Sequence, residues 1–292
     1  MKKIFSTCAA TISAAILSAG ILVGCGQSDE FNPKRQISVI SREQGSGTRD
    51  AFVELTGILV KENGKKKDMT SADALVIDGT QAVMSNVAGN EYAIGYISFG
   101  SLNSSVKAVT IEGVPVSVET VREGSYKIAR PFNVAYKNSD NILLNDFLDF
   151  IASKQGSAII EKNGYVSVSE NASDYESKEY VGKLVIAGSS SVSPVMEKLK
   201  EAYMALNKDV VIEIQTNDSS SGMLAAKEGS CDLGMASREL KDSERSALQS
   251  KTIAMDGIAV IANQKNPVKD LKLLEVKSIF TGEAKSWEAF LE

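Results

Sequence analysis

The stretch Ser41-Arg42-Glu43-Gln44-Gly45-Ser46-Gly47-Thr48-Arg49-Asp50 separates two segments with different hydrophobic periods. Before it, Ile37-Ser38-Val39-Ile40 is a short β-branched strand signal, and after it a helical pattern runs from Gly47 to about Glu62. The sequence therefore predicts a strand, a Gly/Ser turn and a helix. Several such units in one chain are typical of an α/β fold.

The same turn has the composition of an anion site. A helix N-terminus offers unpaired N–H groups and the positive end of the helix dipole, and small residues let an anion approach the backbone. Ser46 and Thr48 add hydroxyl donors, and Arg42 adds a planar cation suited to tetrahedral oxyanions. The alternative is a capped helix after a flexible turn, with Arg42 in solvent.

Composition limits the classes of function. The 292 residues include 43% hydrophobic and 24% charged side chains, as in ordinary globular proteins. The formal charge is -5, and removal of Lys2 and Lys3 with a leader makes it -7, which argues against nucleic acid as a partner. Histidine is absent, so Ser-His and Cys-His catalysis is excluded. With Cys8 and Cys25 in or beside the leader, no cysteine zinc site is expected.

The N-terminal segment predicts export and anchoring. Residues 1–24 contain Lys2-Lys3 and then a mostly apolar run, as in a signal peptide. The end of that run, Leu22-Val23-Gly24-Cys25, resembles the lipobox of bacterial lipoproteins, in which the cysteine is lipidated. Residues 25–36 are expected to be a polar tether. An ordinary signal peptide with a chance cysteine is the alternative.

Two further strand-turn-helix units follow along the chain. A strand at 183–187 leads into the turn Gly-Ser-Ser-Ser-Val-Ser at 188–193, and one at 210–214 into Asn-Asp-Ser-Ser-Ser-Gly at 217–222. Helix N-termini that converge from several strands form the usual crevice of an open α/β sheet, although three independently capped helices are the alternative. The polar segment 167–182 is expected to be a surface linker, and Lys65-Lys66-Lys67 a solvated turn.

Taken together, these motifs resemble the phosphate-binding component of the bacterial phosphate ABC transporter, a substrate-binding lipoprotein. The resemblance rests on Ser-Arg-Glu-Gln-Gly-Ser-Gly-Thr-Arg-Asp-Ala-Phe (41–52), Ala-Ile-Gly-Tyr-Ile-Ser (93–98), Gly-Ser-Ser-Ser-Val-Ser-Pro (188–194), Gly-Met-Ala-Ser-Arg-Glu-Leu (234–240), Asp-Gly-Ile-Ala-Val-Ile (256–261) and Ile-Phe-Thr-Gly (279–282). It implies a two-lobed α/β fold of the periplasmic-binding-protein type II, with a ligand cleft between the lobes and a hinge of two crossing strands. It also implies phosphate and permease subunits as partners, a lipid anchor on the extracytoplasmic face of the cell membrane, and no catalysis, cofactor or metal.

The order of the motifs differs from the family. There the motifs matching 188, 234, 256 and 279 come first, whereas here those at 41, 93 and 132 do. This resembles a circular permutation in which the linker joins the family's usual ends. A fragment of a tandem array is the alternative. On the permuted mapping, lobe B consists of residues 37–131 and 262–292, and lobe A of residues 132–261.

The resemblance also implies which residues bind the ligand. From lobe B these are Arg42, Ser46, Gly47 and Thr48, and from lobe A they are Ser190, Ser191, Ser219 or its neighbour Ser220, and Ser237. Some family members have an Asp at the position of Ser237, where it can accept the proton of phosphate and repel sulfate. With Ser237 there, the acceptor is open, and Asp50 or a hydroxyl oxygen are candidates.

Other functions remain open at this stage. The same fold can bind sulfate or molybdate, or can serve a phosphate sensor or scavenger that feeds no permease. An acyl enzyme is a remote alternative, because Ser104-Ser105-Val106-Lys107 has the S-x-x-K spacing.

Overall fold

The strands form one long mixed sheet and two small pairs. The computed structural model describes residues 30–137, 139–169 and 172–291. The strands are β1 (Ser38–Arg42), β2 (Leu59–Glu62), β3 (Lys65–Asp68), β4 (Leu75–Ile77), β5 (Ala93–Ser98), β6 (Val106–Ala108), β7 (Thr110–Ile111), β8 (Ala129–Tyr136), β9 (Val166–Ser167), β10 (Gly182–Ser189), β11 (Val210–Asn217), β12 (Leu233–Ala236), β13 (Gln249–Asn263) and β14 (Asp270–Leu271).

Helices pack against the sheet in both of its halves. The α-helices are α1 (Gly47–Leu55), α2 (Thr80–Ala88), α3 (Val118–Arg122), α4 (Ile142–Ala152), α5 (Lys154–Lys162), α6 (Ser193–Leu206), α7 (Ser219–Glu228), α8 (Asp242–Arg245) and α9 (Leu273–Thr281), with short 3-10 turns η1 (Phe99–Ser101) and η2 (Trp287–Phe290). Most elements expected from the sequence are present.

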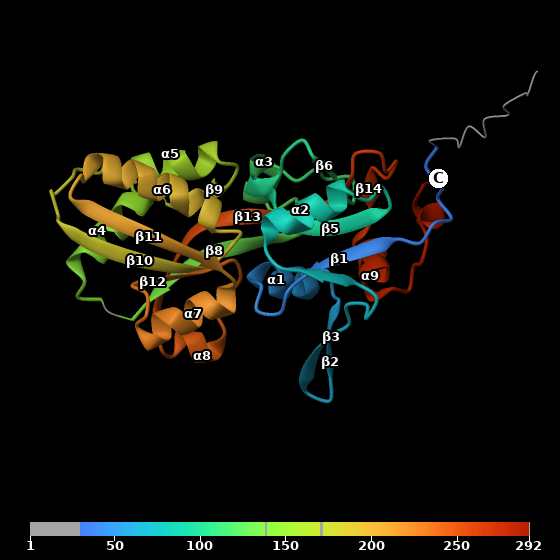
Figure 1. Cartoon of the computed structure of the whole chain (residues 1–292), viewed down its shortest axis with the longest axis horizontal. Coiled ribbons are helices and arrows are strands. Elements are labelled where there is room, and N and C mark those ends of the chain that lie inside the picture. The colour runs from blue at the N-terminus through green and yellow to red at the C-terminus, as the bar shows by residue number, and fades with distance from the viewer. Residues whose placement is uncertain (1–29, 138, 170–171, 292) are drawn as a thin grey trace, which may run out of the picture. The chain divides into compact units, whose positions relative to one another are not determined.

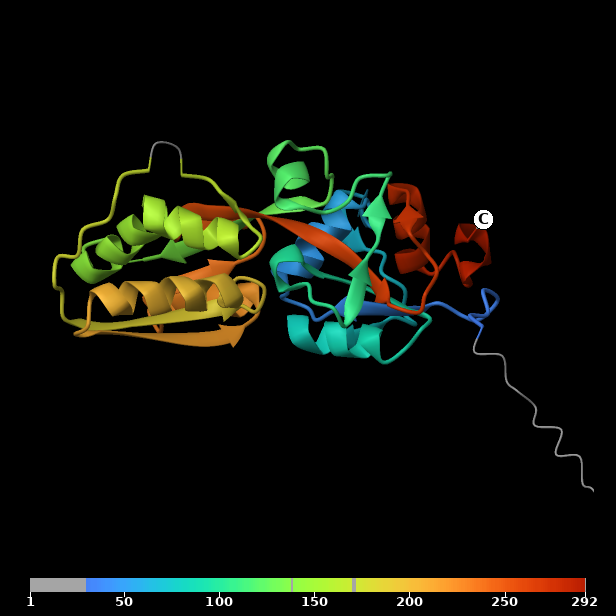
Figure 2. The same cartoon turned by 90° about the horizontal axis from the view of Figure 1, so that it is seen from above.

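Two strands run through the middle of the sheet and connect its halves. The strand order is β11-β10-β12-β8-β13-β5-β1-β4. The first part of β13 pairs with β8, and residues 258–262 pair antiparallel with β5. Figures 1 and 2 show β13 passing from one half into the other. The outer pairs β10–β11 and β1–β4 are parallel, so the carboxyl ends of the two strands in each pair lie at the same edge of the sheet.

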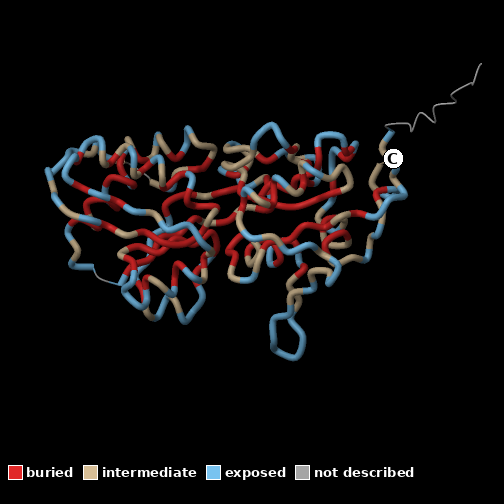
Figure 3. Tube along the Cα trace, viewed as in Figure 1, coloured by how far each residue is buried: buried red, intermediate tan, exposed pale blue. Residues whose placement is uncertain are grey.

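Each half has its own hydrophobic core, so the protein has two lobes. The core of lobe B includes Phe52, Tyr96 and Trp287. The core of lobe A includes Phe147 and Tyr203, and a smaller cluster lies under α7. In Figure 3 the red, buried segments run through the strands of both halves.

The packing differs from the sequence-based division at one boundary. Residues 258–262 of β13 are buried in the core of lobe B, although the sequence assigned residues up to 261 to lobe A. The chain changes lobe near Asp256, because β13 continues as one strand and its side chains meet the second core from Ile258 onward.

The first helix is shorter than the sequence predicts. It ends at Leu55 rather than about Glu62, because Gly57 has φ +70° and the chain turns into β2. Lys65-Lys66-Lys67 is part of β3 rather than a loop, since Asn63-Gly64 forms a tight two-residue turn with positive φ at both residues. The hairpin tip is exposed, as expected (Figure 3).

The predicted linker is irregular but fastened to lobe A. Tyr175 Oη donates to the buried Asp146 Oδ2 at 2.6 Å, and Lys178 Nζ lies 3.2 Å from the other carboxylate oxygen. Tyr203 Oη of α6 donates to Asp146 Oδ2 as well, at 2.7 Å. One buried carboxylate therefore holds the segment against α4 and α6.

The predicted signal peptide (1–24) and lipidation site (Cys25) lie outside the described residues. Of the predicted tether 25–36, residues 30–36 are described, and Gln36 forms a β-bridge with Ser286.

Candidate functional site

The turn after β1 is built as the sequence predicts. Ser46 is the N-cap of α1, and its hydroxyl accepts from Arg49 N at 3.3 Å. Gly45 has φ +91°, which bends the chain into the helix. Gly47 and Thr48 occupy the first turn of α1 and are buried. Ser46 is thus committed to capping, whereas Thr48 points its hydroxyl into the space between the lobes.

Arg42 is the buried cation of this turn. Its guanidinium is paired twice with Glu43, from Nε and Nη2, each at 2.7 Å. Nη2 also donates to Ser190 Oγ of lobe A at 3.0 Å. The side chain is only 2% exposed, so Glu43 offsets a charge that would otherwise be costly to bury.

Arg42 and Thr48 meet the turn after β10. Thr48 Oγ1 and Ser191 Oγ lie 2.8 Å apart, and Thr80 Oγ1 lies 3.2 Å from Ser191 Oγ and 3.3 Å from Ser190 Oγ. Both predicted serines therefore face the lobe B residues, as the resemblance implied. Thr80, at the N-terminus of α2, joins them.

Ser219 and Ser237 extend this group within lobe A. Their hydroxyls lie 3.4 Å apart, and Ser219 Oγ accepts from Ser237 N at 3.1 Å. Ser189 Oγ donates to Ser237 Oγ at 2.9 Å. A Cβ on Gly47 would lie 2.4 Å from Ser219 Oγ and 2.9 Å from Ser237 Oγ, so lobe B approaches these hydroxyls closely.

We call these seven side chains the hydroxyl cluster: Thr48, Thr80, Ser189, Ser190, Ser191, Ser219 and Ser237. Thr48, Thr80 and Ser219 lie at the N-termini of α1, α2 and α7. Residues 189–191 lie at the end of β10 and in the turn before α6, and Ser237 directly follows β12. Helix dipoles and free N–H groups there favour an anion. The structure thus brings together strand-end turns from both lobes.

Ser220 lies at the margin of the cluster rather than within it. Its backbone N–H and its hydroxyl donate to Gly45 O at 3.2 and 3.3 Å. Arg238 Nη2 donates to the Ser220 hydroxyl at 3.3 Å. Of the two neighbouring candidates, Ser219 is fully buried and faces the other hydroxyls.

Sequence reasoning missed Thr80 and Ser189. Thr80 follows Asp78-Gly79 directly before a predicted helix, which is the same turn-to-helix signal as at Gly47. Ser189 is the last residue of β10, one position before the serines that were selected. In both cases the local signal was present, but tertiary contacts select the side chain: Thr80 meets serines of the other lobe, and Ser189 meets Ser237 within lobe A.

A buried ion pair between the crossing strands β8 and β13 lies next to Ser237 of the hydroxyl cluster. Arg130 of β8 donates from Nε and Nη2 to Asp256 Oδ2 of β13 at 3.1 and 3.0 Å, and from Nη1 to Ser237 O at 3.0 Å. Ser98 Oγ donates to Asp256 Oδ1 at 3.0 Å. Burial raises the pKa of Asp256 to about 6 although Arg130 opposes this shift. The pair links both lobes to the backbone of Ser237.

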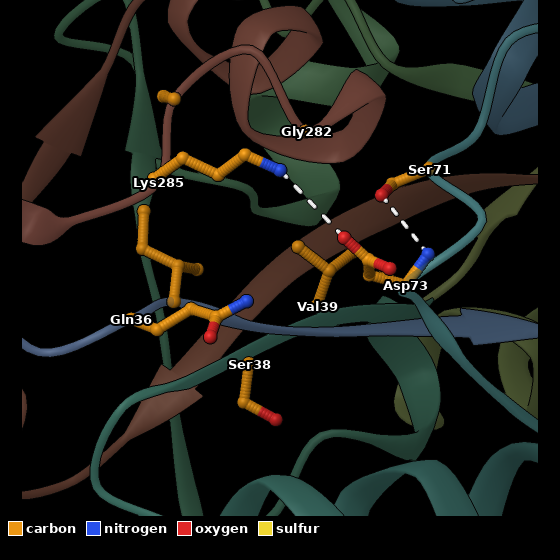
Figure 4. A pocket seen from close by; sticks show the side chains of 9 residues that line it. Gln36, Ser38, Val39, Ser71, Asp73, Gly282 and Lys285 are labelled. Carbon is orange, nitrogen blue, oxygen red and sulfur yellow. Dashed lines mark hydrogen bonds and ion pairs between the residues drawn. The ribbon is translucent and has the colours of Figure 1, made fainter.

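Of the cavities in the described part of the chain, two that lie outside the hydroxyl cluster border β1 or the contact between the lobes. One of 280 Å³ is lined by Gln36, Ser38, Val39, Ser71, Asp73 and Lys285, and Figure 4 shows the ion pair of Lys285 with Asp73 across it. The other, of 860 Å³, lies between the lobes and is lined by α1, Pro131, Met255 and the segment after β12.

The remote S-x-x-K hypothesis gains no support from geometry. Ser104 is exposed in a turn before β6, and Lys107 donates to the carbonyl of Asn266. Burial lowers the pKa of Lys107, and Lys269 lowers it further, but its ammonium is engaged by that carbonyl.

The described residues also bear on metal binding and membrane insertion. They contain no group of three or more His, Cys, Asp or Glu side chains placed to hold a metal ion. No helix among them is long and apolar enough to cross a membrane.

Comparison with known proteins identifies the family. The PBP superfamily domain matches residues 11–155 and 173–291. A phosphate-binding protein PstS 2 of Streptococcus agalactiae is 49% identical over 277 residues, which cover 94% of each chain. This chain belongs to the PstS family of phosphate-binding proteins. The predicted recognition of that family is therefore confirmed.

A solved relative extends the match to the fold. The crystal structure of a phosphate-binding protein of a phosphate ABC transporter from Streptococcus pneumoniae is 45% identical, with a TM-score of 0.71, and covers 87% of this chain and 99% of its own. The predicted two-lobed α/β fold of type II is confirmed by this match.

Other PstS relatives match only a part of the chain. PstS of Staphylococcus saprophyticus is 37% identical over 109 residues, 35% of this chain and 34% of that protein. PstS of Bacillus subtilis is 33% identical over 110 residues, 37% of each.

Proposed function

We propose that this protein captures inorganic phosphate outside the cell membrane and delivers it to the permease of an ABC transporter. The observation that carries the proposal is the hydroxyl cluster with Arg42, assembled from both lobes at several helix N-termini. The names of the relatives, phosphate-binding proteins of phosphate ABC transporters, support the same ligand.

The chemistry of the cluster suits a dehydrated phosphate. The ion has about a dozen lone pairs, and neutral N–H and O–H donors can satisfy them without a large fixed charge. Arg42 supplies one cation, already balanced by Glu43. Ser46 caps α1, and Ser220 binds the carbonyl of Gly45 at the margin of the cluster, so both are proposed to support the site rather than to contact the ligand. The proposed ligand contacts are Arg42, Gly47, Thr48, Ser190, Ser191, Ser219 and Ser237, with Thr80 and Ser189 added.

A hydroxyl oxygen is the proposed acceptor of the phosphate proton. Asp50, the other candidate, lies 3.1 Å from Arg238 Nε and 3.6 Å from Lys241 Nζ. The Asp50 carboxylate is therefore engaged by these two cations rather than by the hydroxyl cluster. Sulfate or molybdate remains the second candidate ligand, because a hydroxyl can also donate to an ion that carries no proton.

Delivery and anchoring belong to the same proposal. The lipobox-like Leu22-Val23-Gly24-Cys25 supports a lipid anchor at Cys25 on the extracytoplasmic face of the membrane. Because binding and release need no covalent step, the function requires neither catalysis nor a cofactor. A sensor or scavenger would use the same site without a permease.

We also propose that the motif order reflects a circular permutation. Lobe B then consists of residues 37–131 and 262–292, and lobe A of residues 132–261, except that the part of β13 after Asp256 packs in lobe B. The two ends of the folded body are close: Ile37 N donates to Lys285 O at 2.9 Å. Full-length matches to some PstS relatives and matches over about a third of others support a change of order.

Calorimetry of the chain without residues 1–25 tests the proposed function. Phosphate is expected to bind with submicromolar affinity and sulfate far more weakly. Arg42→Ala should weaken phosphate binding at least about 30-fold, since breaking a buried charged contact costs roughly 2–5 kcal/mol. Ser104→Ala, in an exposed turn, is the matched control and should bind as wild type. Equal heats for sulfate would overturn the assignment to phosphate.

A further inference from the structure

An ion pair joins the two lobes beside the hydroxyl cluster. Asp50 lies in the first turn of α1, in lobe B, and Arg238 and Lys241 follow β12 in lobe A. Arg238 Nε is 3.1 Å and Lys241 Nζ 3.6 Å from the same oxygen, Asp50 Oδ2. One carboxylate of lobe B therefore faces two cations of lobe A.

Arg238 is held in position by its own lobe. Its Nη1 and Nη2 donate to the two carboxylate oxygens of Glu244, each at 2.8 Å, and Nη1 also donates to Glu239 O at 2.9 Å. Burial alone would raise the pKa of Glu244, but hydrogen bonds from Arg238 and Lys241 N outweigh it and lower the pKa. These contacts do not involve lobe B, so the guanidinium is preorganised to meet Asp50.

The contact is coupled to assembly of the ligand site. A Cβ on Gly47 would lie 3.0 Å from Arg238 Cγ, and Ser220 N donates to Gly45 O at 3.2 Å. The turn at 45–47 therefore meets α7 and Arg238 together. The Asp50 contact requires the same approach of the lobes that brings Gly47 to Ser219.

The contact is electrostatic rather than a directed hydrogen bond. Among the described residues, neither Asp50 Oδ2 nor Arg238 Nε has a hydrogen-bond partner, although they are 3.1 Å apart. Arg238 is 4% exposed and Asp50 38% exposed. The two contacting atoms are themselves buried, but the rest of the Asp50 side chain reaches solvent, so the pair is expected to contribute little and to be weakened by salt.

We propose that Asp50 forms an interlobe latch with Arg238 and Lys241, and that these positioning residues slow the release of bound phosphate. The inference rests on the proposed function. Phosphate enters while the lobes are apart, but it leaves only after the latch opens. Loss of the latch should therefore raise the dissociation rate constant and leave the association rate constant nearly unchanged.

Stopped-flow kinetics of phosphate binding tests the latch in the chain without residues 1–25. Asp50→Asn should raise the dissociation rate constant by about two- to tenfold, as expected for a partly exposed ion pair. Asp50→Glu should restore part of the loss. Asp242→Asn on α8 removes a nearby exposed carboxylate and is the matched control, expected to behave as wild type.

Two further measurements separate a latch from a general structural role. Added NaCl should raise the dissociation rate constant of wild type more than that of Asp50→Asn. In the absence of phosphate, the melting temperature of Asp50→Asn should equal that of wild type. An unchanged dissociation rate in Asp50→Asn, or an equal change in Asp242→Asn, would overturn the latch while leaving phosphate binding intact. Loss of the preference for phosphate over sulfate in Asp50→Asn would instead assign Asp50 to the ligand proton. Absence of phosphate binding by wild type would overturn the proposed function itself.

Discussion

At the scale of the residue, Gly47 marks how closely lobe B approaches lobe A. A Cβ in place of its hydrogen would lie 2.4 Å from Ser219 Oγ and 2.9 Å from Ser237 Oγ. Those hydroxyls belong to the proposed ligand site, so any larger residue would compete with the approach of the lobes. The glycine is required by a close approach between segments far apart in the sequence, not by an unusual φ.

Gly47→Ala should therefore impair binding more than folding. Overpacking of a close contact costs about 1–3 kcal/mol, which predicts a 5- to 150-fold loss of phosphate affinity. The free energy of unfolding should fall less than the free energy of binding, because separation of the lobes relieves this contact without disrupting either core. Calorimetry and thermal melts measure the two effects. Gly89→Ala, where the nearest atom lies 3.4 Å away, is the control; an equal loss of affinity in both variants would contradict this explanation.

At the scale of the element, α7 combines stability with ligand contacts. Asp218 is its N-cap and accepts from Ser221 N at 2.9 Å, while Gly229 ends the helix with φ +79°. The cap orients the first turn, which carries Ser219 into the hydroxyl cluster and Ser220 toward Gly45.

Loss of this cap should weaken both folding and binding. Asp218→Ala is expected to lower the free energy of unfolding by about 0.5–2 kcal/mol, as for other N-caps. Phosphate affinity should fall in parallel, because the first turn of α7 is less ordered. Urea unfolding and calorimetry measure the two quantities. Asp218→Asn keeps the cap and should stay close to wild type, and a full loss in this variant would show that charge rather than capping matters.

At the scale of the whole molecule, neither the ends nor the linker take part in the proposed site. The segment before β1 meets the segment after α9 in lobe B, where Ile37 N donates to Lys285 O. The linker is fastened to lobe A through Asp146, Tyr175 and Lys178. The proposed ligand contacts come from other segments. The position of the chain ends can therefore change without altering how the lobes pack around the ligand.

A chain with relocated ends should therefore keep its function. We expect a variant that begins at residue 172 and ends at residue 169, with residue 291 joined to residue 37 by a short flexible linker, to fold and bind phosphate within about threefold of wild type. Circular dichroism and calorimetry check the outcome. A control opened at the exposed Asn63-Gly64 turn should behave alike. Failure of the first variant alone would assign the linker a structural role that exceeds its visible contacts.

The sequence by itself determined the local units of this protein and their chemistry. The β-branched run before Arg42 and the small residues after it predict a strand and a helix start, because both signals depend on neighbouring residues. The same holds for the serine turns at 188–193 and 217–222. The motifs at 41–52 and 188–194, together with four others, carry the resemblance to the family. Where the local signal was ambiguous, as in the helix beyond Leu55, a positive φ at Gly57 and a hairpin replaced the expected helix.

Only the tertiary structure decided which of these side chains meet. Thr80 and Ser189 join the hydroxyl cluster, Ser46 is used as a cap, and Ser220 stays at the margin. Likewise, the contact between Asp50 and Arg238 joins residues from different lobes. The physical reason is that hydroxyl selection and ion pairing depend on distances of a few ångströms between segments 48 or more residues apart. The crossing of β8 and β13 sets those distances between the lobes.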